Sequence, residues 1–175
     1  MKSSGNSKFF FFVAVAAFAG ALFFLVGKYF KTSEGPCVFC KQEILDKQKF
    51  YEDDLVLGLV THKPIVPGHV LIVTKRHVEH FEQLTQEEIA RIGEIVKRVH
   101  AASSRAYAAS SYLLLQKNGM PAGQTVPHMH LHYIPCKGKE TPGVGFLLRF
   151  IFVPMLPAIS EQKMRSEVAK MQLQL

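Results

Sequence analysis

The sequence predicts an α+β domain, in which an antiparallel sheet packs with one long helix, preceded by an N-terminal transmembrane helix. Three observations predict this class. An uncharged apolar run lies within the first thirty positions, several short apolar segments after it are separated by turn residues, and one amphipathic pattern is long enough for an extended helix. The chain has 175 residues, so the part after the apolar run is large enough for one substantial core.

The N-terminal segment resembles a membrane anchor. Residues 9–26 contain no charged or polar side chain, and at 1.5 Å per residue they span about 27 Å, close to a hydrocarbon core of roughly 30 Å. A cleaved signal peptide is the alternative, but its apolar region is usually only about 7–15 residues long and is followed by small residues. We therefore expect a tail over 1–8, a transmembrane anchor over 9–30 and a linker over 31–36.

Strand and helix patterns follow in order. Alternating or apolar runs bounded by turn residues predict strands over 49–52, 55–61, 69–74, 111–117 and 124–135. A Pro-rich loop separates the second strand from the third. Thr85 and Glu88 have the spacing of a capping box, and apolar residues then recur on one stripe. These features predict a helix over 86–108.

The last segment, 141–175, contains an unexpectedly apolar stretch over 145–157, which Arg149 and Pro154 interrupt. It is too short for a second membrane span. Two interpretations remain open: a buried element beneath the C-terminal helix, or a hydrophobic patch that lies on the membrane beside the anchor. Ser160 is placed to cap a final helix over 161–173.

Charge and cysteine content exclude several classes. The net charge of +7 is spread along the chain without a basic tract or interleaved aromatic residues, which argues against nucleic-acid binding. Three cysteines are too few for a disulfide scaffold of this length. A small anionic substrate remains compatible with this composition.

The chemistry is concentrated in the segment VPHMHLHYIP, in which His128, His130 and His132 alternate with apolar residues. On a strand, alternate side chains share one face, about 6.5–7 Å apart. Such a row either binds a metal ion or provides a nucleophilic imidazole assisted by its neighbours. Gln124 and Thr125 follow a flexible glycine turn just upstream, and their neutral donors suit a phosphate better than a metal sphere.

The stretch AGQTVPHMHLHYIP resembles the signature of the histidine triad (HIT) superfamily, and LVTHKPIVPGHVLIVTKRHVEHFEQL is similar to its earlier strand–loop–strand. The loop is most similar to the dinucleoside-polyphosphate branch. The resemblance covers 37–137, and we assign a HIT domain to 37–140. It implies a HIT-like antiparallel sheet, nucleotidyl transfer or hydrolysis at an α-phosphate, and a possible homodimer.

The resemblance also implies residue roles. His130 would be the nucleophile that forms a nucleotidyl-histidine intermediate, and His132 would contact the phosphate and assist the departing group. Gln124 and Thr125 would donate hydrogen bonds to phosphate oxygens. His69, in PGHV, would help to hold the triad.

Two positions depart from the family pattern. Thr61 stands where an acidic or amide residue often contacts the ribose. Lys117 stands where Asn or Gln commonly lies near the leaving group, and a cation there would favour an anionic leaving group such as a polyphosphate. Alternatively, the register shifts by one residue and Asn118 or Gln116 takes this role.

A second group of residues has metal-ligand spacing. Cys37 and Cys40 form a C-x2-C motif, which is compatible with a zinc site, a redox pair or a disulfide. Some bacterial HIT proteins are similar here and bind structural zinc, which implies His77 and His128 as the other two ligands. Zinc-bound thiolates and a nucleotide substrate both favour a reducing compartment, so we expect the domain at the cytoplasmic face of the membrane.

The sequence therefore predicts a membrane-anchored HIT-type nucleotidyl hydrolase or transferase, which acts on a nucleotide conjugate such as a dinucleoside polyphosphate or a nucleoside phosphoramidate. Catalysis would need no cofactor, and zinc would be structural. Two alternatives are kept: a metal-dependent hydrolase that uses the His-x-His strand, and a non-catalytic nucleotide-binding protein.

Overall fold

The structure is a computed structural model that describes residues 35–138 and 143–175, together with Val13 and Gly20. The chain divides into two compact units, 1–31 and 32–175. The second unit contains the predicted strands and the histidine row, and the elements below all belong to it.

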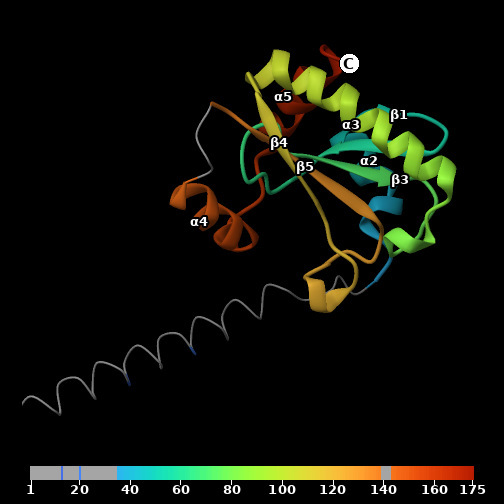
Figure 1. Cartoon of the computed structure of the whole chain (residues 1–175), viewed down its shortest axis with the longest axis horizontal. Helices are drawn as coiled ribbons and strands as arrows, with labels where there is room; N and C mark the ends of the chain where they lie inside the picture. The colour runs from blue at the N-terminus through green and yellow to red at the C-terminus, as the bar shows by residue number, and fades with distance from the viewer. Residues whose placement is uncertain (1–12, 14–19, 21–34, 139–142) are drawn as a thin grey trace, which may run out of the picture. The chain divides into compact units, whose positions relative to one another are not determined.

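One antiparallel sheet of five strands forms the centre of this unit, in the order β1-β2-β3-β5-β4 (Figure 1). Its strands are β1 (Lys49–Glu52), β2 (Val56–Val60), β3 (Val70–Thr74), β4 (Ser111–Gln116) and β5 (His130–Cys136). β2 and β3 are buried along their whole length, as expected for apolar strands covered on both faces. The predicted α+β class with an antiparallel sheet is confirmed.

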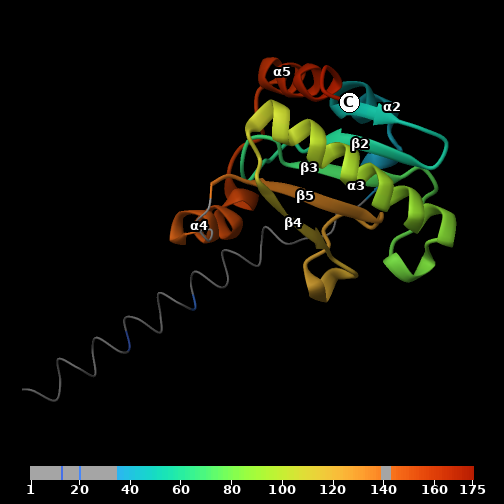
Figure 2. The same cartoon turned by 45° about the horizontal axis from the view of Figure 1, so that its top comes forward.

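The long helix α3 (Gln86–Tyr107) covers one face of the sheet (Figure 2). The predicted capping box begins it: the Thr85 side chain accepts from the Glu88 backbone N–H, and the Glu88 carboxylate accepts from the Thr85 N–H. Its apolar stripe packs on Val70 and Ile72 of β3 and on Tyr133 of β5. The C-terminal helix α5 (Glu161–Gln172) contacts α2, α3 and β1, so it belongs to the same packed unit.

The opposite face of the sheet carries the histidines. Direct pairing places His130 opposite Val73 and His132 opposite Leu71, and paired residues point to the same side. The short helices η1 (Val38–Cys40) and α2 (Gln42–Gln48) lie at this face, where Phe39 packs against Leu71 and its neighbours. The sequence patterns did not predict η1 or α2. The turn η2 (Phe81–Gln83) lies in the loop before α3, and the turn η3 (Met120–Ala122) lies in the loop after β4.

The last predicted strand is shorter than expected. It was predicted over 124–135, but β5 begins only at His130. A tight turn, in which the His128 N–H donates to the Val126 carbonyl, precedes it, and Pro127 within this turn has no N–H for a ladder. His128 therefore lies outside the strand, so the three histidines do not form one continuous row.

The apolar segment over 145–157 forms α4 (Val144–Phe152) and the turn η4 (Val153–Met155). Phe146, Phe150 and Val153 pack against Ile65 and Ile134, on the sheet face that carries the histidines. Its exposed apolar side chains include Leu147, Leu148, Ile151, Phe152 and Leu156. The segment is thus half-packed on the face that carries the histidines, and the interpretation of an element buried beneath the C-terminal helix was wrong.

The membrane localisation predicted from the sequence requires a correction. Among the helices in the described part of the chain, none combines the length and the apolar character needed to cross a bilayer. The apolar helix α4 has nine residues, whereas a span needs about 20. This contradicts the predicted single-pass anchor with a cytoplasmic catalytic domain, and we do not retain it. The predicted span over 9–30 lies outside the described residues, except for Val13 and Gly20.

Candidate active site

The ring of His130 is oriented by the backbone carbonyl of His128, two positions before it. Its Nδ1 lies 2.6 Å from the backbone carbonyl oxygen of His128. A carbonyl oxygen only accepts, so Nδ1 carries the hydrogen and Nε2 keeps its lone pair. Burial lowers the pKa of His130, and the charge of Lys117 lowers it further, against the opposing effect of the His128 carbonyl. The imidazole is therefore neutral near pH 7, the state in which it attacks an electrophile.

His132 has the opposite hydrogen placement, because a relay of two bonds fixes it. The Ile65 N–H donates to Nδ1 of His69 (3.2 Å), so in neutral His69 the hydrogen is on Nε2. That nitrogen lies 2.9 Å from Nδ1 of His132 and donates to it. Burial lowers the pKa of His69 to about 3 and holds that of His132 well below its usual value, so both rings are neutral. His132 then carries its hydrogen on Nε2.

The two rings thus offer complementary groups. The ring centroids of His130 and His132 are 5.1 Å apart, and His130 provides a lone pair where His132 provides an N–H donor. A nucleophilic nitrogen beside a donor is suited to displacement at phosphorus, because the donor stabilises phosphate oxygens or the departing atom.

These lowered pKa values predict the pH dependence of turnover. Because the pKa of His130 lies below its ordinary value of 6.5, the nucleophile stays unprotonated at mildly acidic pH. We expect the acidic limb of kcat/KM to have its midpoint below pH 6.5, as measured for the full chain between about pH 4 and 8. A midpoint at or above 6.5 would contradict this arrangement.

The buried side chain of Gln124 holds the loop before β5 through hydrogen bonds to the backbone. The residue is buried, its Oε1 accepts from the Gly119 N–H (2.6 Å), and its Nε2 donates to the carbonyls of Glu79 (2.8 Å) and Val126 (3.1 Å). These bonds commit the amide to backbone groups. In this structure Gln124 therefore stabilises the loop before β5. Thr125 beside it is half-buried.

The remaining predicted substrate residues lie at different places. Thr61, at the end of β2, is buried, and its hydroxyl accepts from the Lys63 N–H (3.5 Å). The Asn118 side-chain oxygen accepts from the Phe81 N–H (3.0 Å), which ties η2 to the turn after β4. Lys117 lies near the triad: its charge lowers the pKa of both His130 and His132.

The predicted metal ligands come together. Cys37, Cys40, His77 and His128 place one ligand atom each within 4.8 Å of one another. The Cys37 Sγ lies 3.2 Å, and the Cys40 Sγ 3.6 Å, from Nδ1 of His128, and Nδ1 of His77 lies 3.5 Å from the Cys40 Sγ. Two thiols and two imidazoles form the donor set of a structural zinc site. The three cysteines of the chain are free.

The geometry of this cluster fits a tetrahedral ion. Usual Zn–S and Zn–N bond lengths imply ligand-to-ligand separations of about 3.3–3.8 Å, close to the distances above. Nε2 of His128 lies 2.8 Å from the Thr74 carbonyl oxygen and must donate to it, which leaves Nδ1 with the lone pair that a metal requires. Burial and the neighbouring Cys37 raise the pKa of the Cys40 thiol to about 11, and a bound cation would reverse this effect.

One site residue escaped the sequence analysis. Phe39, between the two cysteines, packs edge-on against His130 and His128, with ring centroids 5.3 and 5.9 Å away. It links η1 to His130 of β5. The only signal was an aromatic residue inside the C-x2-C motif, which by itself indicates nothing about the distant histidines.

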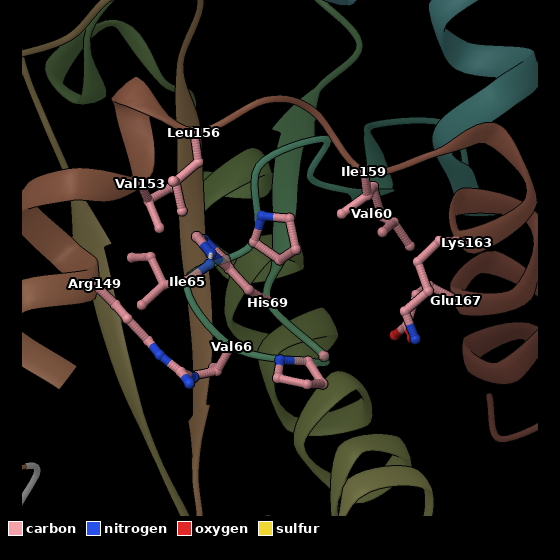
Figure 3. Close-up of a pocket in the computed structure, with 13 residues that line it drawn as sticks. Val60, Ile65, Val66, His69, Arg149, Val153, Leu156, Ile159, Lys163 and Glu167 are labelled. Carbon is pink, nitrogen blue, oxygen red and sulfur yellow. Dashed lines mark hydrogen bonds and ion pairs between the residues drawn. The ribbon is translucent and has the colours of Figure 1, made fainter. Parts of the chain in front are cut away.

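A cavity of about 360 Å³ lies beyond His69, between the loop after β2 and the C-terminal elements (Figure 3). Its walls are mostly apolar, with Arg149 on one side and the Lys163–Glu167 pair across from it. His69 lines this cavity and also bonds His132, so His69 connects the cavity to the triad.

Comparison with known proteins identifies the family of this chain. The sequence pattern of the HIT domain matches residues 42–139, which is more than half of the chain. The chain belongs to the HIT family. This confirms the superfamily predicted from the alternating histidines. The matched residues include the triad, His69 and His77, whereas Cys37 and Cys40 precede them.

Curated relatives of this HIT protein include enzymes. It is 39% identical over 93 residues to an asymmetrical bis(5'-nucleosyl)-tetraphosphatase of Schizosaccharomyces pombe, covering 53% of this chain and 51% of the relative. It is 34% identical over 103 residues to a bis(5'-adenosyl)-triphosphatase of Dictyostelium discoideum, covering 59% and 66%. The chain spans about half the length of the first of these relatives. The prediction of an enzyme of the HIT superfamily is confirmed at the level of the family.

Solved structures share the fold. The NitFhit protein of Caenorhabditis elegans superposes with a TM-score of 0.61 at 27% identity, covering 74% of this chain and 27% of that protein. A HIT-family protein of Bacillus subtilis superposes with a TM-score of 0.54 at 33% identity, covering 60% and 76%.

Proposed function

We propose that this HIT protein hydrolyses or transfers the nucleotidyl group of a nucleotide conjugate, by attack of His130 on the α-phosphate. The observation that carries this proposal is the hydrogen placement in the triad. The His128 carbonyl leaves the lone pair on Nε2 of His130, and the relay through His69 leaves the hydrogen on Nε2 of His132. The names of the relatives support a nucleotide conjugate as the substrate.

The reaction proceeds in two displacements. Nε2 of His130 forms a bond to the α-phosphorus, the bond from phosphorus to the leaving group breaks, and its electron pair departs with that group. Water then attacks the phosphorus of the nucleotidyl-histidine, the phosphorus–nitrogen bond breaks with its electron pair returning to Nε2, and the proton of the attacking water goes to solvent. The N–H of His132 donates to a phosphate oxygen or to the departing atom, which lowers the energy of both transition states.

The covalent intermediate provides the direct test. The full chain is incubated with a dinucleoside polyphosphate that is radiolabelled at the α-phosphate, and then quenched and analysed. We expect an acid-labile label that is bound to histidine in the wild-type chain and missing in the His130→Ala variant. A label that persists in that variant would exclude the role of His130.

The second candidate, a metal-dependent hydrolase that uses the His-x-His strand, is less favoured. The metal-ligand cluster uses His128, but in the described residues it does not include His130, whose Nδ1 bonds the His128 carbonyl. Turnover that withstands a strong chelator would argue further against this alternative.

We further propose that Cys37, Cys40, His77 and His128 hold a structural zinc ion, for which the donor set and the tautomer of His128 are suitable. When bound, the ion would cross-link η1 to the loops that follow β3 and precede β5. The His128 ring would bind the ion while its carbonyl orients His130, so one residue serves both sites.

We propose that two copies of the chain form a homodimer through the edge of the sheet at β4. β4 is an edge strand, and Tyr112, Leu113 and Leu114 on it are each about 40% exposed. An apolar edge strand of this kind pairs readily with a second copy of itself. We expect the wild-type chain to elute as a dimer in light-scattering chromatography and a Leu114→Lys variant as a monomer with similar circular dichroism. A monomeric wild-type chain at micromolar concentration would contradict the proposal.

A further inference from the structure

The cavity beside His69 is built partly by segments that lie outside the matched HIT domain. Arg149 lies on α4, and Lys163 and Glu167 lie on α5, whereas the match ends at residue 139. The opposite wall is the loop over 64–69, which belongs to the matched domain. The volume of about 360 Å³ is within the range of small-molecule sites, roughly 300–1,000 Å³. The C-terminal segments thus enclose a ligand-sized space against a loop of the HIT domain.

The walls of this cavity are connected by Tyr107, at the end of α3. A Cβ atom at Gly68, whose φ is +85°, would come within 2.7 Å of the Tyr107 ring, so the loop packs closely on that ring. The Tyr107 hydroxyl donates to the Glu167 carboxylate (2.6 Å), which ties α5 to the same point. The Ile159 N–H donates to the His62 carbonyl oxygen (2.9 Å) and fixes the segment before α5. The cavity is therefore preformed, which reduces the entropy that is lost when a ligand binds.

Most of the lining is apolar. Ile65, Val66 and Pro67 line the cavity from the loop, and Val153, Leu156 and Ile159 line it from the C-terminal segments (Figure 3). Leu156 is 52% exposed, so part of this apolar lining faces solvent. The hydrocarbon part of a ligand would be removed from water here, which favours binding.

The charged lining residues leave one cation uncompensated. The two carboxylate oxygens of Glu167 bind the Lys163 Nζ (2.6 Å) and the Tyr107 hydroxyl (2.6 Å). Burial opposes ionisation of Glu167, but these two partners outweigh it and lower its pKa, so Glu167 and Lys163 form a neutral pair. Arg149 is exposed and makes no hydrogen bond or ion pair with any residue that the structure describes. Figure 3 shows its side chain along one wall, across the cavity from the pair.

We propose that this cavity binds a small amphipathic carboxylate, whose apolar chain packs between the loop and η4 and whose carboxylate pairs with Arg149. A guanidinium binds a carboxylate through two parallel hydrogen bonds. One uncompensated cation matches a monovalent carboxylate better than a phosphate monoester, whose second charge would lie near Glu167 without a partner.

This site is distinct from the one at which His130 attacks, and it does not depend on the proposed function. Of the described residues, neither His130 nor His132 lines the cavity. An occupant would nevertheless contact His69, whose ring bonds His132. The site therefore lies one residue away from the triad.

The experiment compares octanoate with octan-1-ol, which has the same chain length and no charge, by titration calorimetry on the full chain. We expect one octanoate per chain, bound about tenfold or more tightly than the alcohol. Arg149→Gln should weaken octanoate binding about tenfold and leave the binding of octan-1-ol unchanged. The matched control is Arg165→Gln, which removes an exposed arginine of α5 that pairs with Glu161 and does not line the cavity. It should change the binding of neither probe.

A second variant tests the cavity independently of charge. Because Leu156 lines the cavity and is exposed, Leu156→Trp should fill the space while the thermal unfolding midpoint stays within a few degrees. We expect it to weaken the binding of both probes about tenfold or more. Saturating AMP should not displace octanoate from the wild-type chain. The site would be overturned by a wild-type chain that does not bind octanoate, by equal affinity for the two probes, by octanoate binding that either variant leaves unchanged, or by competition from AMP.

Discussion

Replacing His130 with Ala is expected to reduce turnover of a nucleotide conjugate by about 10⁴-fold or more, with little effect on folding. No other ring in the triad combines a free Nε2 lone pair with a backbone carbonyl that fixes the hydrogen on Nδ1. Without the nucleophile the covalent intermediate cannot form, and the other residues of the site cannot compensate for this loss. The measurement is kcat under saturating substrate, together with the thermal unfolding midpoint of the same variant.

The matched control for this variant is His100→Ala. His100 lies on α3, on the other face of the sheet, where its Nδ1 lies 2.9 Å from the Tyr133 hydroxyl. It is a half-buried histidine with a hydrogen-bond partner, yet it is remote from the triad. We expect it to lose some stability and to retain kcat within a few-fold. If His130→Ala keeps more than about one per cent of wild-type activity, His130 is not the nucleophile.

Loss of the proposed zinc ion is expected to be the largest stability change. Structural zinc sites contribute folding free energy directly, and a double Cys37→Ser and Cys40→Ser variant removes both thiolate ligands. We expect the free energy of unfolding to fall by about 3–5 kcal/mol, which lowers the midpoint by roughly 10 °C or more. Calorimetry and elemental analysis of the purified chain measure the two effects together, with one zinc per chain expected in the wild type.

Cys136→Ser is the control for this double variant. Cys136 is a half-buried thiol at the end of β5, and its Sγ lies 3.8 Å from the Ile134 carbonyl oxygen. It should change neither the zinc content nor the midpoint by more than a few degrees. A wild-type chain that is purified without zinc, and whose midpoint a chelator leaves unchanged, would contradict the proposed metal site.

Much of the sheet and the long helix could be predicted because their signals are local. The predicted strand over 49–52 and the helix beginning at Gln86 match β1 and α3, since turn residues and a capping box act within a few positions. The start of β5 could not be predicted from alternation alone, because the turn at Val126–His128 overrides the period of two. The position of Gln124 just before the histidines suggested a role in the site. Its hydrogen bonds to Glu79 and Gly119 could not be predicted, because they depend on how the fold brings these loops together.

The sequence by itself determined the fold class and the family, and it indicated the candidate site residues, because the alternating histidines and the C-x2-C pair are dense local patterns of rare residue types. The tertiary structure alone decided how those residues act. The tautomers of His130 and His132 follow from the His128 carbonyl and from His69, which lies 63 positions from His132. Lys117 comes beside the triad only because β4 pairs with β5. The position of a ring hydrogen and the distance between two charges both depend on contacts across the sheet. The order of residues along the chain does not give these distances.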